Sequence, residues 1–185
     1  KCRTISPAVH GELSRRLANL AQRQHEIVAR HLGRVVYSGG DDLLAFLPLH
    51  TVLPCAMAIR EEMRKREHLG DRFDISAGVA VAHYRDPLGL TLREARRAEK
   101  YAKKTPGKGA FQVRVLKRSG APLRVTLPWT FGSGRSTVDA LVRLEDARVR
   151  LEDAREDARG DSREDRHPLA KVKVARELEI EAATL

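Results

Sequence analysis

The sequence predicts an α+β fold in which helices pack over an antiparallel β-sheet. Apolar residues recur at helical spacing in some segments and cluster in short β-compatible runs in others, and the two kinds of segment alternate along the chain. The expected order is helix, β-hairpin, helix, strand, helix, strand. A hydrophobic content of 42% over 185 residues provides a core for one ordinary domain, or for one domain with an appendage.

The first expected elements are a long helix and a tight hairpin. The helix runs from residue 6 to about residue 31, where leucine and alanine recur at helical spacing. Two apolar runs, residues 35–37 and 43–47, then flank the sequence Gly39-Gly40-Asp41-Asp42. Paired glycines between β-compatible runs predict a tight turn, so this segment should be a hairpin with two carboxylates at its tip.

Four further elements complete this part of the chain. They are a helix over residues 51–68, a strand over 73–82, a helix over 92–104 and a last strand over 110–117. In the first of these helices, Arg60 is expected on the outward, solvated face. Gly78, in the middle of the strand, indicates close packing or a bulge.

The character of the sequence changes beyond residue 130. Residues 131–134, which contain two glycines, indicate a linker. The sequence Val-Arg-Leu-Glu-Asp-Ala-Arg then occurs twice in tandem over residues 142–155. This repeat predicts a helix with many charged side chains of both signs that packs on a neighbouring element. We therefore expect two parts, a helix-and-sheet domain over residues 1–130 and a helical C-terminal segment over residues 131–185.

Positive charge is concentrated in the first part. Residues 131–185 carry 11 basic and 13 acidic side chains; of the totals of 35 and 25, this leaves 24 basic and 12 acidic side chains in residues 1–130, a balance of +12. Such a field suits a polyanionic partner, either RNA or a triphosphate. A solvated basic surface without a partner explains the charge equally well.

Composition also argues against a membrane span and a disulfide scaffold. The sequence contains no uncharged apolar run of the roughly 18 residues that a spanning helix needs. Two cysteines, Cys2 and Cys55, cannot build a zinc ribbon or a disulfide framework. We expect Cys55 to be a small core residue, and a reducing cytoplasm to be the setting.

Asp41 and Asp42 are the candidate metal ligands. Adjacent carboxylates are hard oxygen ligands suited to Mg²⁺ bridged to nucleotide phosphates, and their negative charges repel unless a cation compensates them. Gly39 and Gly40 would permit the turn and let a phosphate approach the backbone closely. A single Gly-Asp pair is typical of an ordinary turn, but the doubled glycine and doubled aspartate favour a nucleotide site.

In this order of elements, the hairpin resembles the palm fold of GGDEF-type nucleotide cyclases and related polymerases. Over roughly residues 3–130 the chain is more closely similar to the large palm-domain subunit of type III CRISPR effector complexes, Cmr subtype. The stretches that carry this likeness are residues 6–10, 36–45, 76–83, 98–103 and 118–120. The hairpin is the one strong motif, and the shared order of all five makes the likeness specific.

The resemblance implies a palm-type, ferredoxin-like antiparallel sheet with helices on one face. In palm enzymes the first strand lies upstream of the first helix and supplies another metal-binding aspartate. This chain begins at the helix, so we expect a palm sheet missing its first strand, and a chain that is inactive in isolation.

The resemblance also implies an activity in RNA-guided antiviral defence. The family's subunit sits in a ribonucleoprotein with CRISPR RNA and other effector subunits, and on binding target RNA it converts ATP into cyclic oligoadenylates. By this resemblance Asp41 and Asp42 bind Mg²⁺ or Mn²⁺ and are catalytic. The implied nucleotide-binding residues are Ser38, Gly39, Gly40, Lys100, Lys103, His10 and Ser14.

These residues divide into three groups by their implied role. Ser38 would hydrogen-bond a phosphate or the base, next to the two glycines. Lys103 and Lys100 would face the triphosphate, although a solvated helix face explains both lysines as well. His10 and Ser14, one helical turn apart, would line the adenine pocket, although a surface cap explains them nearly as well.

Two other functions remain open. The first is a non-catalytic scaffold palm that binds RNA and partner subunits, which the basic charge fits equally well. The second is a diguanylate-cyclase-like domain, against which stands Asp42-Leu43 where that family has Glu-Phe.

Overall fold

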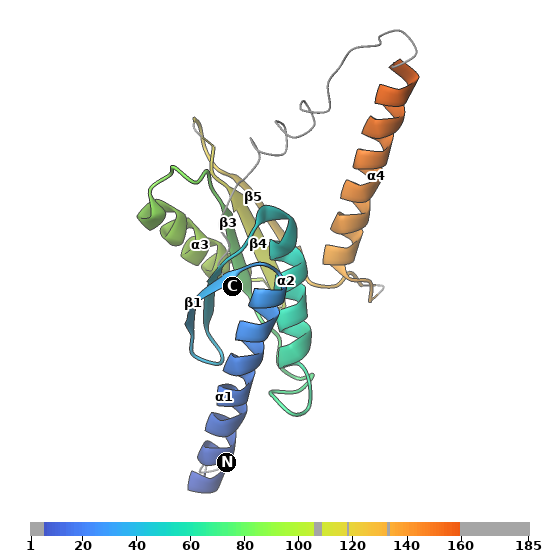
Figure 1. The fold of residues 1–185 in the computed structure, drawn as a ribbon. Coiled ribbons are helices and arrows are strands. Elements are labelled where there is room, and N and C mark those ends of the chain that lie inside the picture. The colour runs from blue at the N-terminus through green and yellow to red at the C-terminus, as the bar shows by residue number, and fades with distance from the viewer. Residues whose placement is uncertain (1–5, 106–108, 118, 133, 160–185) are drawn as a thin grey trace. The chain divides into compact units, whose positions relative to one another are not determined.

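A computed structural model describes residues 6–105, 109–117, 119–132 and 134–159 (Figure 1). The chain divides after Pro128 into two compact units. The elements of the first unit are α1 (Pro7–Arg30), β1 (Arg34–Ser38), β2 (Leu43–Phe46), α2 (Leu49–Met63), β3 (Ala77–Val81), α3 (Leu88–Ala102), β4 (Ala110–Val115) and β5 (Leu123–Pro128). The α+β class and the order of the expected elements are confirmed.

The strand β5 is an addition to the expected elements, in which residues 110–117 form the last strand. β5 pairs antiparallel with β4 over its whole length, from Ala110 opposite Pro128 to Val115 opposite Leu123. Its side chains are mostly exposed. An edge strand of this kind has no buried apolar face, so its sequence lacks the signal on which the strand prediction relied.

The strands of the first unit form two sheets. β1 and β2 make the expected antiparallel hairpin, with Ser38 opposite Leu43 and an irregularity between Val35 and Tyr37. β3 pairs with β4 in parallel, so the expectation of an antiparallel sheet was wrong at this position. The reason lies in the connection, because a helix that crosses over between two paired strands returns the second strand in the direction of the first.

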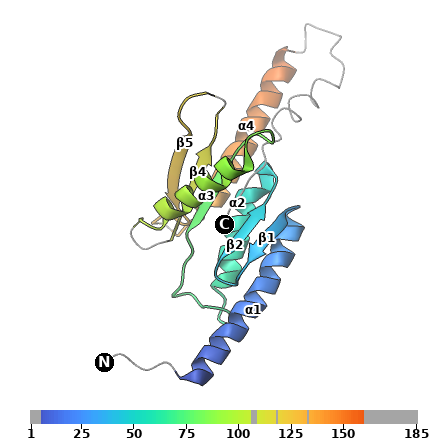
Figure 2. The ribbon, with the colours of Figure 1, turned by 90° about the vertical axis from the view of Figure 1, so that its left-hand side faces the viewer.

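Helices cover both faces of β3, whereas helices on one face were expected. All five residues of β3 are buried. Val79 and Val81 belong to the core cluster that contains Ile27 of α1 and Ile59 of α2. Gly78 alternates with them and faces α3, where a Cβ atom at this position would lie 2.3 Å from the carbonyl oxygen of Ala95. Figure 2 shows α3 running alongside the β3–β4 sheet.

A single core joins the two sheets. Leu43 and Ala45 of β2 lie in the same cluster as Val79 and Val81 of β3. Within the described residues, however, β2 and β3 belong to separate sheets and share no strand pairing. Two sheets over one core agree with a palm-like α+β fold.

The tip of the hairpin packs directly on α1. Gly40 has a φ of +92°, a conformation that residues with a Cβ atom rarely adopt. A Cβ atom here would lie 2.8 Å from the backbone oxygen of Leu17. Glycine is therefore required twice over, for the turn itself and for the close approach to the helix.

Two buried ion pairs hold other parts of the unit together. Arg60, expected on the outside of α2, is 7% exposed and pairs with both carboxylate oxygens of Asp74 at 2.7 Å. Arg114 of β4 is 3% exposed and donates to Glu94 of α3 at 2.6 Å. The outward placement of Arg60 was wrong, because residue spacing alone does not reveal a carboxylate on the loop that covers the helix.

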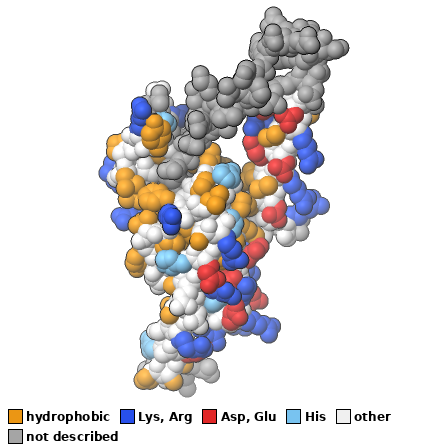
Figure 3. All heavy atoms as spheres, in the orientation of Figure 1, with side chains coloured by type: hydrophobic (Ala, Val, Ile, Leu, Met, Phe, Trp, Pro, Cys, Tyr) orange, Lys and Arg blue, Asp and Glu red, His pale blue; other side chains and the backbone are white. Residues whose placement is uncertain are grey.

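The second unit contains α4 (Thr137–Arg159), as the expected helical segment requires. The hydroxyl of Ser136 accepts a hydrogen bond from the Asp139 backbone at 3.1 Å and caps the start of the helix. Figure 3 shows acidic and basic side chains interspersed along α4. Leu144 and Leu151 are exposed. In the described part of the chain, none of the helices has both the length and the apolar character needed to span a bilayer.

Cys55 is a core residue, as expected. It is fully buried within the main core cluster, and burial raises the pKa of its thiol to about 12. The thiol is therefore protonated and unreactive at neutral pH.

We predict that Gly40→Ala destabilises the chain more than Gly120→Ala does. Both positions have positive φ, which costs a side-chain-bearing residue roughly 1–2 kcal/mol. At Gly120 nothing lies within 4 Å of the new Cβ atom, whereas at Gly40 it overlaps Leu17. Urea unfolding should give Gly40→Ala an additional loss of about 1–3 kcal/mol. Equal losses would mean that the tip does not rest on α1.

We also predict that Arg114→Met lowers the free energy of unfolding by about 3–5 kcal/mol, because it leaves the buried carboxylate of Glu94 without its partner. Arg97→Met is the matched control, since Arg97 pairs with the same carboxylate but has a 63% exposed side chain. The control should lose at most about 1 kcal/mol. Chemical denaturation of both variants checks this.

Acid should weaken the same pair. Burial raises the pKa of Glu94, but hydrogen bonds from Arg114 and Arg97 outweigh it and hold the pKa below its ordinary value of 4.5. The carboxylate's contribution to stability is therefore present above pH 4.5 and is lost as pH falls through the lowered pKa. Glu94→Gln should reduce this acid dependence, and an unchanged acid profile would contradict the assignment.

Candidate nucleotide and metal site

The hairpin tip presents two aspartates to solvent. The Gly39 backbone N–H donates to the carbonyl oxygen of Asp42 at 2.8 Å, which closes the turn between β1 and β2. The side chains of Asp41 and Asp42 are exposed. Among the described residues, neither carboxylate takes part in a hydrogen bond or a close ion pair. Both are therefore free to receive a cation, which would also relieve their mutual repulsion.

Gln24 joins the tip to α1 and was missed by the sequence reasoning. Its side chain is 1% exposed, and its Nε2 donates to the carbonyl oxygen of Gly40 at 2.9 Å. The Ser38 hydroxyl donates to Gln24 Oε1 at 2.7 Å. The available signal was a polar residue on the helix face that also carries Leu20 and Ile27.

Lys103 lies at the end of α3, close enough to the aspartates to interact with them electrostatically. It forms an ion pair with Glu99, one turn earlier. The hydrogen bond to Glu99 raises the pKa of Lys103, and the charges of Asp42 and Asp41 raise it further. Lys103 therefore stays protonated at neutral pH and contributes a fixed positive charge beside the tip.

The other predicted nucleotide-binding residues are exposed but make no described side-chain contact with the tip. Lys100 lies on α3, and His10 and Ser14 lie on α1. His10 precedes Leu17 by seven residues, as Leu17 precedes Gln24, so the three share one helix face. This places His10 about 10 Å along the helix axis from the point where the tip packs. The roles of these residues stay predictions.

The donor set at the tip suits a hard divalent cation bound together with phosphates. Mg²⁺ is commonly held by one or two carboxylates, with substrate phosphates and water supplying the remaining oxygens. Within the described ranges, the one group of three acidic or histidine ligands close enough to share a metal is Glu62, Glu67 and His68, away from the hairpin. No third carboxylate of the described residues therefore joins Asp41 and Asp42.

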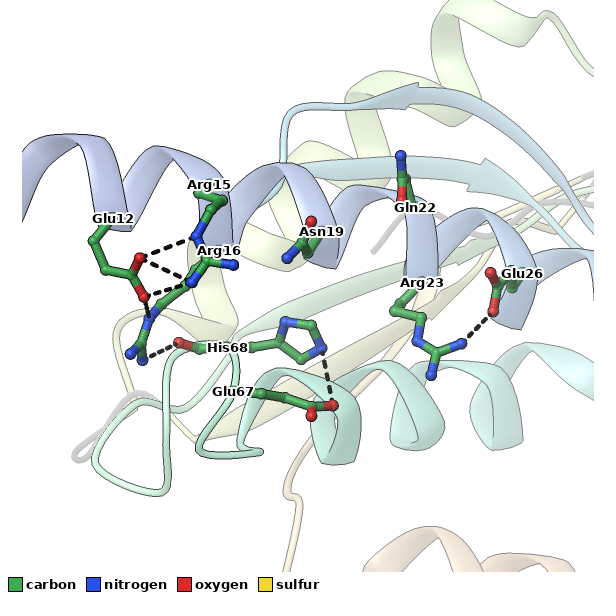
Figure 4. Close-up of a pocket in the computed structure, with 9 residues that line it drawn as sticks. All are labelled: Glu12, Arg15, Arg16, Asn19, Gln22, Arg23, Glu26, Glu67 and His68. Carbon is green, nitrogen blue, oxygen red and sulfur yellow. Dashed lines mark hydrogen bonds and ion pairs between the residues drawn. The ribbon is translucent and has the colours of Figure 1, made fainter.

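A pocket of about 460 Å³ lies between α1 and the turn after α2 (Figure 4). Its charged side chains largely pair with one another. Glu12 binds Arg15 and Arg16, and Arg23 binds Glu26. None of the predicted site residues lines it. This pocket is separate from the hairpin tip and offers few uncommitted charges.

Comparison with known proteins identifies the family to which this sequence belongs. Residues 1–112 match the model of the Cas10/Cmr2 second palm domain. The chain is 38% identical over 120 residues to the CRISPR system Cmr subunit Cmr2 of Pyrococcus furiosus. The aligned region covers 63% of this chain and 14% of that protein. It is 28% identical over 133 residues to the CRISPR system CMR subunit Cmr2 of Saccharolobus solfataricus, and this aligned region covers 60% of this chain and 12% of that protein.

The chain thus spans less than a sixth of the length of these relatives. The family match includes all of α1, the hairpin, α2, β3 and α3, which are the elements that position the aspartates and Lys103. Because the match also extends over more than half of the chain, the chain belongs to the Cas10/Cmr2 second palm domain family, the palm of the large subunit of Cmr-type type III CRISPR complexes.

Proposed function

We propose that this chain is the palm-domain part of a nucleotidyltransferase that makes cyclic oligoadenylates from ATP when its RNA-guided complex binds target RNA. The single observation that carries the proposal is the hairpin tip, where Asp41 and Asp42 are exposed and, among the described residues, have no ion-pair partner, with the protonated Lys103 close enough to interact with them. Family membership supports the nucleotidyltransferase class.

Each residue of the tip would contribute by binding or orienting. Asp41 and Asp42 would hold Mg²⁺ or Mn²⁺, which stabilises charge as a ribose hydroxyl attacks an α-phosphate and pyrophosphate leaves. Gly39 and Gly40 would let a phosphate approach the backbone of the tip from the sides that Tyr37 and Leu17 do not fill. Lys103 would neutralise part of the triphosphate charge from the end of α3.

The wider setting is part of the same proposal. The balance of +12 in residues 1–130 supports binding of CRISPR RNA and target RNA next to other effector subunits. Cys55 is a free, buried cysteine, which suits a reducing cytoplasm. With two carboxylates in the described donor set, we expect the isolated chain to be inactive and the assembled complex to be the active species.

A scaffold palm without turnover is the competing function, and the described donor set of two carboxylates favours it to some degree. The decisive experiment incubates the assembled complex with labelled ATP, Mg²⁺ and target RNA. Oligoadenylate products support the proposal. RNA binding without any product supports the scaffold, and turnover of GTP alone would support a diguanylate-cyclase-like activity.

We predict that changing both Asp41 and Asp42 to alanine abolishes oligoadenylate synthesis and leaves RNA binding nearly unchanged. The substitutions remove both candidate metal ligands, whose side chains are exposed and lie outside the contact between the tip and α1. Asp71→Ala, at another exposed aspartate, is the control and should keep wild-type activity. Product formation and RNA binding are measured on the same preparations. Loss of RNA binding as well would mean that the hairpin is structural.

We predict that Lys103→Met raises KM for ATP about tenfold, the effect of losing roughly 1.4 kcal/mol of substrate binding. Lys104→Met is the matched control, because Lys104 is the next exposed lysine and its ammonium lies 5.0 Å from the Tyr101 ring centroid. Steady-state kinetics at several ATP concentrations distinguishes the two variants. An equal effect of both substitutions would reflect general surface charge and would argue against a specific role for Lys103.

A further inference from the structure

We propose that Gln24 is the positioning residue of the hairpin tip: its buried carboxamide fixes the turn that presents Asp41 and Asp42. This role deepens the proposed function and rests on it for its catalytic consequence. Gln24 does not reach the nucleotide in this role. It acts through the backbone of the tip.

The contacts of Gln24 span the turn. On one side of Gly39, the Ser38 hydroxyl donates to Gln24 Oε1 at 2.7 Å. On the other side, Gln24 Nε2 donates to the Gly40 carbonyl at 2.9 Å. The turn itself has one further described backbone hydrogen bond, from the Gly39 N–H to the carbonyl oxygen of Asp42. The carboxamide therefore supplies two described side-chain hydrogen bonds that hold the tip, one on each side of Gly39.

Only one orientation of the Gln24 amide satisfies these partners. The Gly40 carbonyl can only accept, so it requires the NH₂ end of the carboxamide. The Ser38 hydroxyl can then donate to the carbonyl end. A reversed amide would set two oxygens against each other at Gly40. The arrangement is thus specific to glutamine, and glutamate in its ionised form could not reproduce the bond to Gly40.

Because Gln24 is buried, losing either of these two hydrogen bonds is more unfavourable than it would be at the surface. Gln24 lies on the face of α1 that also buries Leu20, Ile27 and Val28. An apolar side chain at position 24 would fill the same space, but it would leave the Gly40 carbonyl and the Ser38 hydroxyl without their partner, which is unfavourable for each group that stays buried. A glutamine among apolar neighbours is better explained by the geometry it imposes on the tip than by its contribution to packing.

The same geometry changes the expected role of Ser38. Its hydroxyl proton is engaged by Gln24, so in this conformation Ser38 links the tip to α1 and has no proton to offer a phosphate. The two residues form one unit, and removing either should disturb the aspartates in the same way. Their effects should therefore fail to add.

The test compares Gln24→Met with Gln22→Met in the assembled complex. Methionine has nearly the volume of glutamine but lacks both amide groups, and Gln22 is exposed on the same helix. For Gln24→Met we expect about a tenfold or greater fall in kcat and a rise in the Mn²⁺ concentration needed for half-maximal rate, because small displacements of catalytic groups are costly. RNA binding should stay unchanged, and Gln22→Met should behave as wild type.

A merely structural role gives a different result. If Gln24→Met lowers the melting temperature but leaves kcat and the Mn²⁺ dependence unchanged, the proposal is overturned. Should Gln24→Met yield too little folded complex, Ser38→Ala removes one of the same bonds with a smaller loss and should show the same shift in Mn²⁺ dependence. In the double variant, Ser38→Ala should add little to the effect of Gln24→Met.

Hydrogen exchange separates this inference from the proposed function. In Gln24→Met, the Gly39 amide should exchange faster, while the amides of β3 should keep their wild-type protection. If the wild-type complex makes no oligoadenylate, the proposed function fails, and faster exchange at Gly39 still supports Gln24 as the residue that fixes the tip. Unchanged exchange at Gly39 overturns the inference whatever the activity.

Discussion

The contact between the hairpin tip and α1 is the constraint on which the candidate site depends. Gly40 lies so close to Leu17 that no side chain fits between them, and Gln24 binds the tip from the next part of the same helix face. Close packing and hydrogen bonding act at two points seven residues apart, so the helix holds the turn in both position and orientation. With its inner side against α1, the turn leaves the side chains of Asp41 and Asp42 exposed.

A second close approach brings the positive charge to the site. Gly78 has no side chain, so the backbone of α3 can lie directly on β3. The end of α3 carries Lys103, whose charge interacts with both aspartates. Glu99 forms an ion pair with Lys103 and also packs over Gly78. One residue therefore takes part in both the helix–sheet contact and the ion pair at the end of α3. The close approach at Gly78 therefore helps to place the end of α3, and a larger residue at position 78 would shift that end without touching the site.

Sequence patterns predict those features of the fold that depend on local chemistry. The doubled glycine between β-compatible runs predicts the hairpin, and helical spacing predicts α1, because turn and helix preferences act within a few residues. Features that depend on a partner far along the chain were missed or misplaced. Arg60 was expected outside because nothing near it in sequence reveals Asp74. Gln24 was overlooked because its partners lie at the end of the next strand and in the turn that follows it. The expectation of helices on one face of the sheet was wrong for the same reason, because α3 lies on the second face of β3.

The number of carboxylates at the tip has a consequence for how metal and nucleotide would bind. Two exposed aspartates supply too few oxygens to fill the coordination shell of Mg²⁺, which prefers six. Because no third carboxylate of the described residues joins them, a bound Mg²⁺ would take its remaining ligands from water, from phosphates or from residues outside the described part of the chain. Phosphates would bring oxygen ligands for the cation, and their negative charge would also attract Lys103. Under the proposed function, cation and triphosphate would therefore bind cooperatively at this tip, each supplying what the other lacks, and the turn that Gln24 holds would set how well the two meet.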